Sequence, residues 1–167
     1  MKKIIPFLLF AVSIIIVACS ASRGVTEFEV SAPQPENDQK TYQIGDRAQG
    51  GIVFLVNEDG THGLVAAAQD QFENSGYNEC ADMMNNPLYH DNEGKKYFDW
   101  RLPKVWEAFQ MYLNLHVINQ GNFSSSGYWT SQGPSSFDKM SLVNFSNGLE
   151  FTSLKTDTYR ARAVRAF

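Results

Sequence analysis

The stretch from Ile4 to Ala18 is the feature that most limits how this chain folds, because it is almost entirely apolar. As a helix it would reach about 22 Å at about 1.5 Å per residue, less than the roughly 30 Å hydrocarbon core of a bilayer. Lys2 and Lys3 precede the stretch and Cys19 follows it. A basic start followed by a short apolar run is typical of a secretory signal peptide. We therefore predict that residues 1–18 are a signal peptide and take no part in the fold.

The end of this stretch, Ile16-Val17-Ala18-Cys19, resembles the lipobox of bacterial lipoproteins. The resemblance implies cleavage before Cys19 and attachment of acyl chains such as palmitate to this cysteine. Because each buried methylene contributes about 0.8 kcal/mol, several chains would hold the protein on a membrane permanently. Ser20 rather than Asp follows Cys19, which indicates the outer membrane of the cell envelope under the sorting rule of enteric bacteria. The alternative is an ordinary signal peptide with an incidental cysteine.

The segment that follows is polar and contains Pro33 and Pro35, without a sustained period of 2 or 3.6 residues. It predicts a flexible tether, so that residues 19–41 comprise the lipidated cysteine and a spacer with a reach of roughly 26 Å. The remainder, 42–167, is the size of one ordinary domain.

The charge balance limits the possible partners of this domain. The chain has 14 Lys and Arg against 18 Asp and Glu, and Lys2 and Lys3 leave with the signal peptide. Nucleic acid is therefore not an expected partner, because phosphate binding needs clustered basic residues. Aromatic residues make up 13% of the chain, which suits both a packed core and a surface that stacks on sugars. Cys80 remains without an expected disulfide partner, and we interpret it as a half-buried apolar residue on a helix, the alternative being a reactive thiol.

Alternation and turn residues predict an α+β domain. Two apolar runs flank Asn57-Glu58-Asp59-Gly60, which predicts a hairpin, and Asn147-Gly148 predicts a second. A short helix is expected within 76–86 and a longer one within 104–115, with Pro103 at its start. The other strands are expected at 128–131, 139–145, 149–154 and 159–167. The last of these could close beside the first hairpin.

The longer helix carries apolar residues at helical spacing. Leu102, Val105, Phe109, Tyr112 and Leu113 fall on or near one face. We predict that this stripe packs against the core.

Six segments occur in the order typical of one family. They are Gly50-Gly51-Ile52-Val53-Phe54, His62-Gly63-Leu64-Val65, Asp99-Trp100-Arg101-Leu102-Pro103, Tyr128-Trp129-Thr130-Ser131, Asn144-Phe145-Ser146-Asn147-Gly148 and Arg162-Ala163-Val164-Arg165-Ala166-Phe167. Together they resemble the DUF1566 family, which includes the C-terminal domain of the Legionella collagen-like adhesin. The resemblance implies a C-type-lectin-like fold, with a twisted antiparallel sheet, two helices and the ends of the domain close together.

The adhesin member of that family is associated with sulfated glycosaminoglycans at host surfaces, so the resemblance implies a role in adhesion. This chain has no collagen-like Gly-X-Y repeat, and its acidic balance disfavours polyanions. Calcium-dependent lectins of this fold use Glu-Pro-Asn or Gln-Pro-Asp, and neither run occurs here. Asp82, Asp91, Glu93 and Asp99 are scattered, and His62, His90 and His116 lack metal-ligand spacing. We therefore expect no metal, no cofactor and calcium-independent binding.

Trp100-Arg101-Leu102-Pro103 is also similar to a segment of the formylglycine-generating enzyme family. Those enzymes depend on a pair of cysteines, whereas the expected domain contains Cys80 alone. We interpret the segment as the start of a helix, and we expect no catalytic residues and no enzyme activity. An enzyme related to that fold is kept as an alternative.

Two irregular segments, 85–98 and 119–138, are the places where a binding surface is expected, since loops on a rigid scaffold usually carry recognition. The candidate ligand-binding residues are Tyr89, His90, Tyr97, Phe123, Tyr128 and Phe137, and the alternative is that half or more of them fill the core. We expect a surface-anchored, non-enzymatic domain that binds a glycan or a protein of the envelope or of a host surface. The competing hypothesis is an accessory envelope lipoprotein that binds only other proteins.

Overall fold

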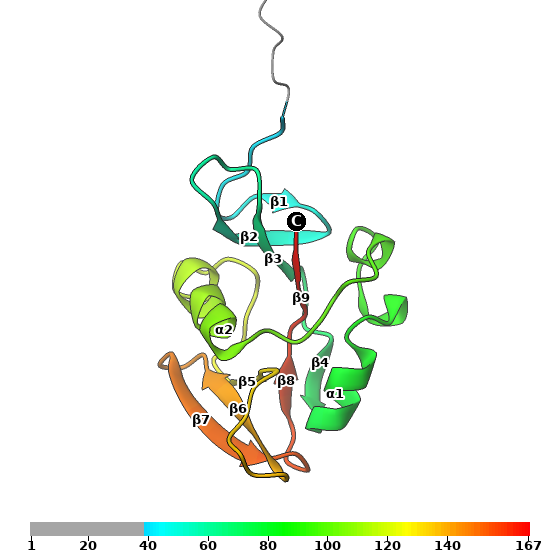
Figure 1. The fold of residues 1–167 in the computed structure, drawn as a ribbon, viewed down its shortest axis with the longest axis vertical. Helices are drawn as coiled ribbons and strands as arrows, with labels where there is room; N and C mark the ends of the chain where they lie inside the picture. The colour runs from blue at the N-terminus through cyan, green and yellow to red at the C-terminus, as the bar shows by residue number, and fades with distance from the viewer. Residues whose placement is uncertain (1–38) are drawn as a thin grey trace, which may run out of the picture. The chain divides into compact units, whose positions relative to one another are not determined.

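Residues 39–167 are described by the computed structural model, and they form an α+β domain with two sheets and two α-helices (Figure 1). The α+β class predicted from the sequence is therefore confirmed. The predicted signal peptide, Cys19 and most of the predicted tether lie outside the described residues.

The first sheet is built on the predicted hairpin. Strands β2 (Gly51–Val56) and β3 (Gly63–Ala67) pair antiparallel around the turn that contains Gly60. The short β1 (Arg47–Ala48) pairs with β2, and β9 (Val164–Ala166) pairs with β3. The strand order is β1-β2-β3-β9, so the predicted closure of the last strand beside the first hairpin is confirmed.

The second sheet has the order β4-β8-β5-β6-β7. Its strands are β4 (Phe72–Ser75), β5 (Gly127–Trp129), β6 (Lys139–Asn144), β7 (Leu149–Leu154) and β8 (Tyr159–Ala161). Strands β6 and β7 form the hairpin that Asn147-Gly148 predicts, and Gly148 takes the left-handed conformation (φ 75°). Strand β5 pairs in parallel with β8, whereas the other pairs in this sheet are antiparallel.

The single strand predicted over 159–167 is wrong. The chain forms β8 in the second sheet, passes through Arg162 and Ala163, and continues as β9 in the first sheet (Figure 1). The connection from β3 to β4 crosses between the same two sheets. It runs beside the connection from β8 to β9, because Ala67 N–H donates to Ala163 O (2.9 Å) and Gln71 N–H donates to Ala161 O (2.9 Å). The two crossings thus form one joint between the sheets.

The two helices lie on opposite sides of the central strands β8 and β9 (Figure 1). Helix α1 (Tyr77–Met83) contributes Cys80 to one core cluster, which also holds Trp100 and Trp129. Helix α2 (Val105–Met111), continued by a π-helix (Tyr112–His116), covers the other cluster. Strand β2 sends side chains to both clusters, so its apolar run is continuous rather than alternating.

The prediction that the apolar stripe of the second helix packs against the core is wrong for Phe109 and Leu113, which are exposed. The helix instead buries Ala108, Met111 and Leu115, which also lie at helical spacing. Apolar residues surround the helix on more than one face, so periodicity alone does not select the buried one. The small Ala108 side chain faces the core, where it permits close approach of the helix.

Candidate functional site

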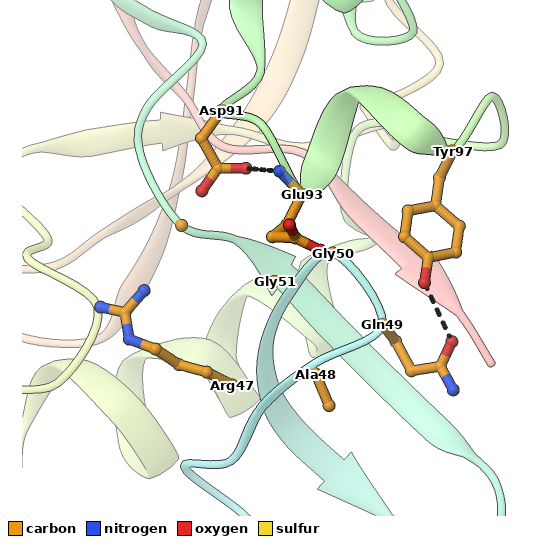
Figure 2. Close-up of a pocket in the computed structure, with 9 residues that line it drawn as sticks. Arg47, Ala48, Gln49, Gly50, Gly51, Asp91, Glu93 and Tyr97 are labelled. Atoms are coloured by element: carbon orange, nitrogen blue, oxygen red, sulfur yellow. Dashed lines mark hydrogen bonds between the residues drawn. The ribbon is translucent and has the colours of Figure 1, made fainter.

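A partly enclosed hollow lies where the predicted loop 85–98 meets the start of the first sheet. It has a volume of about 150 Å³ and is lined by Arg47, Ala48, Gln49, Gly50, Gly51, Ala68, Asp91, Glu93 and Tyr97. In Figure 2, Tyr97 lies on one side of the Gly50–Gly51 backbone, and Asp91 and Arg47 lie on the other. We refer to this hollow as the Gly50 pocket.

Gly50 forms a wall of the pocket that only glycine can form. Its φ of +82° is in the left-handed region. A Cβ atom there would lie 2.6 Å from the Tyr97 ring. The absence of a side chain therefore lets the aromatic ring approach the backbone of the turn.

Contacts with Arg165 and Gln49 hold the Tyr97 side chain in place. The Arg165 guanidinium lies 4.0 Å from the centre of its ring, and Arg165 Nε donates to Asp99 Oδ1 at 2.7 Å. The Tyr97 hydroxyl donates to Gln49 Oε1 (3.5 Å), and Gln49 Nε2 donates to the Tyr42 hydroxyl (2.9 Å). The half-buried Tyr97 ring thus lies against a guanidinium that is itself paired, and these contacts restrict the orientation of the ring.

The opposite side of the pocket is charged. Asp91 Oδ1 accepts hydrogen bonds from Gly94 N–H (2.7 Å) and Glu93 N–H (3.2 Å), which fixes the carboxylate against the loop. Asp91 Oδ2 accepts no hydrogen bond from residues 39–167. Glu93 pairs with Lys96 at 2.8 Å at the surface, and Arg47 is exposed. The pocket therefore presents a carboxylate oxygen and a guanidinium to solvent.

Two of the candidate residues in this loop, Tyr89 and His90, pack inward instead of lining the pocket. The Tyr89 ring packs on Phe72 at 4.8 Å, and the buried His90 ring stacks on Trp100 at 4.8 Å. His90 Nε2 lies 2.7 Å from Met84 O, to which it donates as a neutral imidazole, leaving Nδ1 as a bare acceptor without a partner in the described residues. Burial lowers the pKa of His90, and this outweighs the carbonyl of Met84 and the charge of Asp91.

The three candidates in the second loop lie in three different environments. Tyr128 is fully buried and donates its hydroxyl to Asp70, so the expectation that its ring contacts a ligand is corrected. Burial, followed by the charge of Asp70, raises the pKa of Tyr128. Phe123 is half-buried over the Arg162 guanidinium at 4.0 Å, beside a separate hollow of about 180 Å³. Phe137 is 94% exposed, with Lys155 Nζ 5.2 Å from its ring centre.

The structure therefore does not bring the two predicted loops to one site. Of the six candidates, Tyr97 alone lines the Gly50 pocket. Sequence reasoning missed Arg47, Gln49 and Gly50, although the Gly50-Gly51 pair was a signal of close backbone approach. In the sequence, Asp91 is one of several scattered acidic residues, with no pattern that marks it as a site residue.

The segment Trp100-Arg101-Leu102-Pro103 precedes α2, and its side chains form hydrogen bonds that stabilise the start of this helix. Arg101 donates from both terminal nitrogens to the buried Glu107 carboxylate (2.6 and 2.8 Å), which also accepts from Lys104 N–H at 2.7 Å. Burial works to raise the pKa of Glu107, but the hydrogen bonds from Arg101 and Lys104 together hold it below its ordinary value. Trp100 is buried and donates its indole N–H to Gly94 O (2.8 Å).

Cys80 is fully buried, more deeply than the half-buried position predicted. Burial raises the pKa of its thiol to about 12. A thiol in this environment is protonated and inert at neutral pH.

Within residues 39–167, no group of three or more His, Cys, Asp or Glu side chains is arranged to hold a metal ion. In the same part of the chain, every helix is too short or too polar to cross a bilayer. Comparison of the whole chain with protein-family models found no matching family, and comparison with curated proteins found no match.

Proposed function

We propose that this protein is a surface-anchored, non-enzymatic recognition domain that binds one sugar residue of a glycan in the Gly50 pocket. The observation that carries the proposal is the position of Tyr97 and Asp91 on two sides of a hollow bounded by glycine backbone. An aromatic ring beside fixed hydrogen-bonding groups is the combination that recognises the apolar face and the hydroxyls of a sugar ring.

The size and charge of the pocket limit the kinds of sugar that it can bind. Its volume of about 150 Å³ is below the 300 Å³ or more typical of sites that enclose drug-sized molecules, so it takes a single ring at the end of a chain. Asp91 and Glu93 outnumber Arg47, which disfavours sulfated sugars and favours neutral or amino sugars. The donors and acceptors come from side chains and backbone, so binding does not require calcium.

The test is binding of the detergent-solubilised protein to a broad glycan array, with and without chelator. We expect calcium-independent binding to neutral or amino-bearing terminal sugars. Asp91→Asn keeps an oxygen for the Gly94 and Glu93 amides but removes the charge, and we expect it to weaken binding more than tenfold, in line with about 1.5–3 kcal/mol for a hydrogen bond to a charged group.

Phe137→Ala is the matched control, because Phe137 is an exposed aromatic residue that does not line the pocket. It should bind as the unchanged protein does. Binding that is lost in Phe137→Ala but kept in Asp91→Asn would refute this location. The absence of any glycan binding would refute the function.

The fold and the anchor are part of the same proposal. We propose a C-type-lectin-like arrangement related to the DUF1566 family, which is supported by the two helices and by the closeness of the ends of the domain. Tyr42 and Phe167 pack edge to face with ring centres 5.0 Å apart, and Phe167 and Gly63 exchange two backbone hydrogen bonds. The start of the domain, where the proposed tether joins it, and the end of its last strand therefore lie close together.

The proposed anchor is a lipid on Cys19 in the cell envelope, supported by the lipobox-like sequence that ends there. Replacing Cys19 with Ala should abolish incorporation of labelled palmitate and release the protein from the membrane fraction. Retention of the Cys19→Ala protein in that fraction would contradict the anchor without affecting the glycan site.

A second candidate function, an accessory envelope lipoprotein that binds other proteins, is favoured by the exposed apolar residues Trp106 and Phe109 on α2 and Leu113 on the π-helix after it. It predicts that a different envelope protein purifies with this one in stoichiometric amount. Leu113→Glu should abolish that co-purification.

A further inference from the structure

A second hollow lies at the loop after the π-helix and is separate from the Gly50 pocket. It has a volume of about 180 Å³ and is lined by His116, Asn119, Gln120, Asn122 and Phe123. We refer to it as the Phe123 hollow. Its volume is close to the 150 Å³ of the Gly50 pocket, so the two hollows suit ligand groups of similar size.

An arginine and a glycine hold the aromatic ring of the Phe123 hollow in position. The Arg162 guanidinium lies 4.0 Å from the centre of the half-buried Phe123 ring, and Arg162 is itself paired with Asp70 at 2.6 Å. Gly121 has a φ of +78°, and a Cβ atom there would lie 2.5 Å from the ring. These contacts restrict the orientation of an apolar ring face beside the hollow.

The Gly50 pocket contains the same set of contacts. Its Tyr97 ring lies 4.0 Å from the guanidinium of Arg165, which is paired with Asp99 at 2.7 Å, and a Cβ atom on Gly50 would lie 2.6 Å from the ring. Each hollow therefore combines a half-buried aromatic ring, a paired arginine against it and a left-handed glycine beside it. The repeated construction indicates that both hollows take the same class of ligand, a sugar ring.

The polar groups of the Phe123 hollow are three carboxamides and the His116 ring, and no Asp, Glu, Lys or Arg of residues 39–167 lines it. The side chains of Asn119 and Asn122 are exposed, and neither takes part in a hydrogen bond within the described part of the chain. A carboxamide both donates and accepts hydrogen bonds, which matches the hydroxyl and acetamido groups of a sugar. The lining thus favours a neutral ring.

The segment 45–49 connects the two hollows. A Cβ atom on Gly45 would lie 2.6 Å from Oε1 of Gln120, which lines the Phe123 hollow. Arg47 lines the Gly50 pocket and follows Gly45 by two residues, a span of at most about 7 Å. In Figure 2 the Arg47 side chain points away from Tyr97. The two hollows are therefore neighbours.

Arg162 provides a second connection between them. It donates to Gly121 O (2.9 Å), in the loop of the Phe123 hollow, and to Ala67 O (2.9 Å). The next residue, Ala68, lines the Gly50 pocket. One buried side chain thus bridges the backbones that border the two hollows.

We infer that the Phe123 hollow binds a second, neutral ring of the glycan whose terminal ring occupies the Gly50 pocket, so that the ligand is an oligosaccharide of at least two rings. This inference rests on the proposed function. A glycan that extends from one hollow to the other passes Arg47, which is exposed and can donate hydrogen bonds to its oxygen atoms.

The test is calorimetric titration of the full chain, in a detergent without a sugar headgroup. The probes are glucose, galactose, mannose and N-acetylglucosamine, each as the single sugar, the disaccharide and the trisaccharide. In at least one series we expect the di- or trisaccharide to bind at least about tenfold tighter than the single sugar, because the second ring binds in an intramolecular step.

Asn122→Gly removes a carboxamide from the Phe123 hollow, and glycine readily adopts the left-handed φ of 51° at this position. We expect it to abolish most of the gain from the second ring and to leave binding of the single sugar unchanged. Asn119→Gly, at a φ of 58°, should act in the same way. Ser125→Gly is the matched control, because Ser125 is exposed in the same loop but does not line the hollow, and it should keep the full gain.

Far-UV circular dichroism and the thermal midpoint show that each variant is folded. Equal binding of the single sugar and its oligosaccharides in every series, or a gain that survives both Asn122→Gly and Asn119→Gly, would overturn the second-ring site and leave the Gly50 pocket proposal standing. Absence of binding in all four series would also overturn the neutral oligosaccharide. If the broad glycan array is negative as well, the proposed function is overturned with it.

Discussion

Arg162 and Asp70, which lie on the two adjacent crossings between the sheets, are joined by a hydrogen bond of 2.6 Å from Arg162 Nε to Asp70 Oδ1. Asp70 also accepts from Arg160 (2.9 Å) and from the Tyr128 hydroxyl (3.1 Å). Arg162 donates further to Ala67 O and to two carbonyls of the 119–123 loop. The buried Asp70–Arg162 pair therefore connects both sheets and an adjacent loop.

Replacing Asp70 with Asn should destabilise the domain strongly. The change leaves the buried Arg162 guanidinium without its counter-charge, and breaking a buried pair in this way costs about 3–5 kcal/mol. Urea unfolding followed by tryptophan fluorescence measures the free energy of unfolding. Glu73→Gln is the control, because Glu73 is exposed and lies 3.6 Å from Arg160, and it should cost less than about 1 kcal/mol. Equal effects of the two changes would contradict the central role of Asp70.

The buried His90 ring should make the domain less stable in mild acid. Burial lowers its pKa in the folded state, so the unfolded chain takes up a proton more readily than the folded one. The contribution of the neutral His90 ring to the free energy of unfolding is complete above the unfolded pKa of about 6.5. It is lost as the pH falls below that value, and the free energy of unfolding then changes by at most about 1.4 kcal/mol per pH unit. Urea unfolding between pH 5 and 7.5 measures this slope.

His90→Gln keeps an N–H donor for the Met84 carbonyl but cannot take up a proton in this range. The slope attributed to His90 should therefore disappear in this variant, whatever its stability at pH 7.5. An unchanged slope would show that other groups cause the pH dependence.

Gly50→Ala should reduce glycan binding at least tenfold, because the new Cβ displaces the Tyr97 ring. It should also cost about 1–2 kcal/mol of stability, since φ at this position is in the left-handed region. Gly60→Ala is the control. Gly60 has a similar φ of +77° but lies outside the Gly50 pocket, so this change should cost stability and leave binding intact. Loss of binding in both variants would indicate a general effect of destabilisation.

The Cys80 thiol should not react with maleimide in the native protein at pH 8. With its pKa raised to about 12 and its side chain buried, alkylation should be at least about 1000-fold slower than for an unfolded thiol. Reaction after unfolding in urea is the positive control, and mass spectrometry counts the labelled cysteines. Rapid labelling in native buffer would favour the reactive-thiol alternative.

The sequence correctly predicted those elements that depend on a few adjacent residues. The Asp59-Gly60 and Asn147-Gly148 turns set both hairpins, and Pro103 preceded the second helix as expected. These features depend on backbone conformations that a few adjacent residues favour by themselves. The candidate site was predicted less well, because Tyr97 reaches the Gly50 pocket only through contacts with Gln49 and Arg165, both distant in sequence.

The sequence by itself determined the α+β class, the hairpins and the approximate extent of both helices, because periodicity and turn residues act over short separations. Tertiary structure alone decided which face of α2 is buried, since Ala108 and Phe109 are both compatible with an apolar helix face and packing against β2 selects between them. It also decided the break at Arg162. A buried guanidinium in the middle of a strand-like run becomes favourable only when Asp70, 92 residues away, supplies its counter-charge.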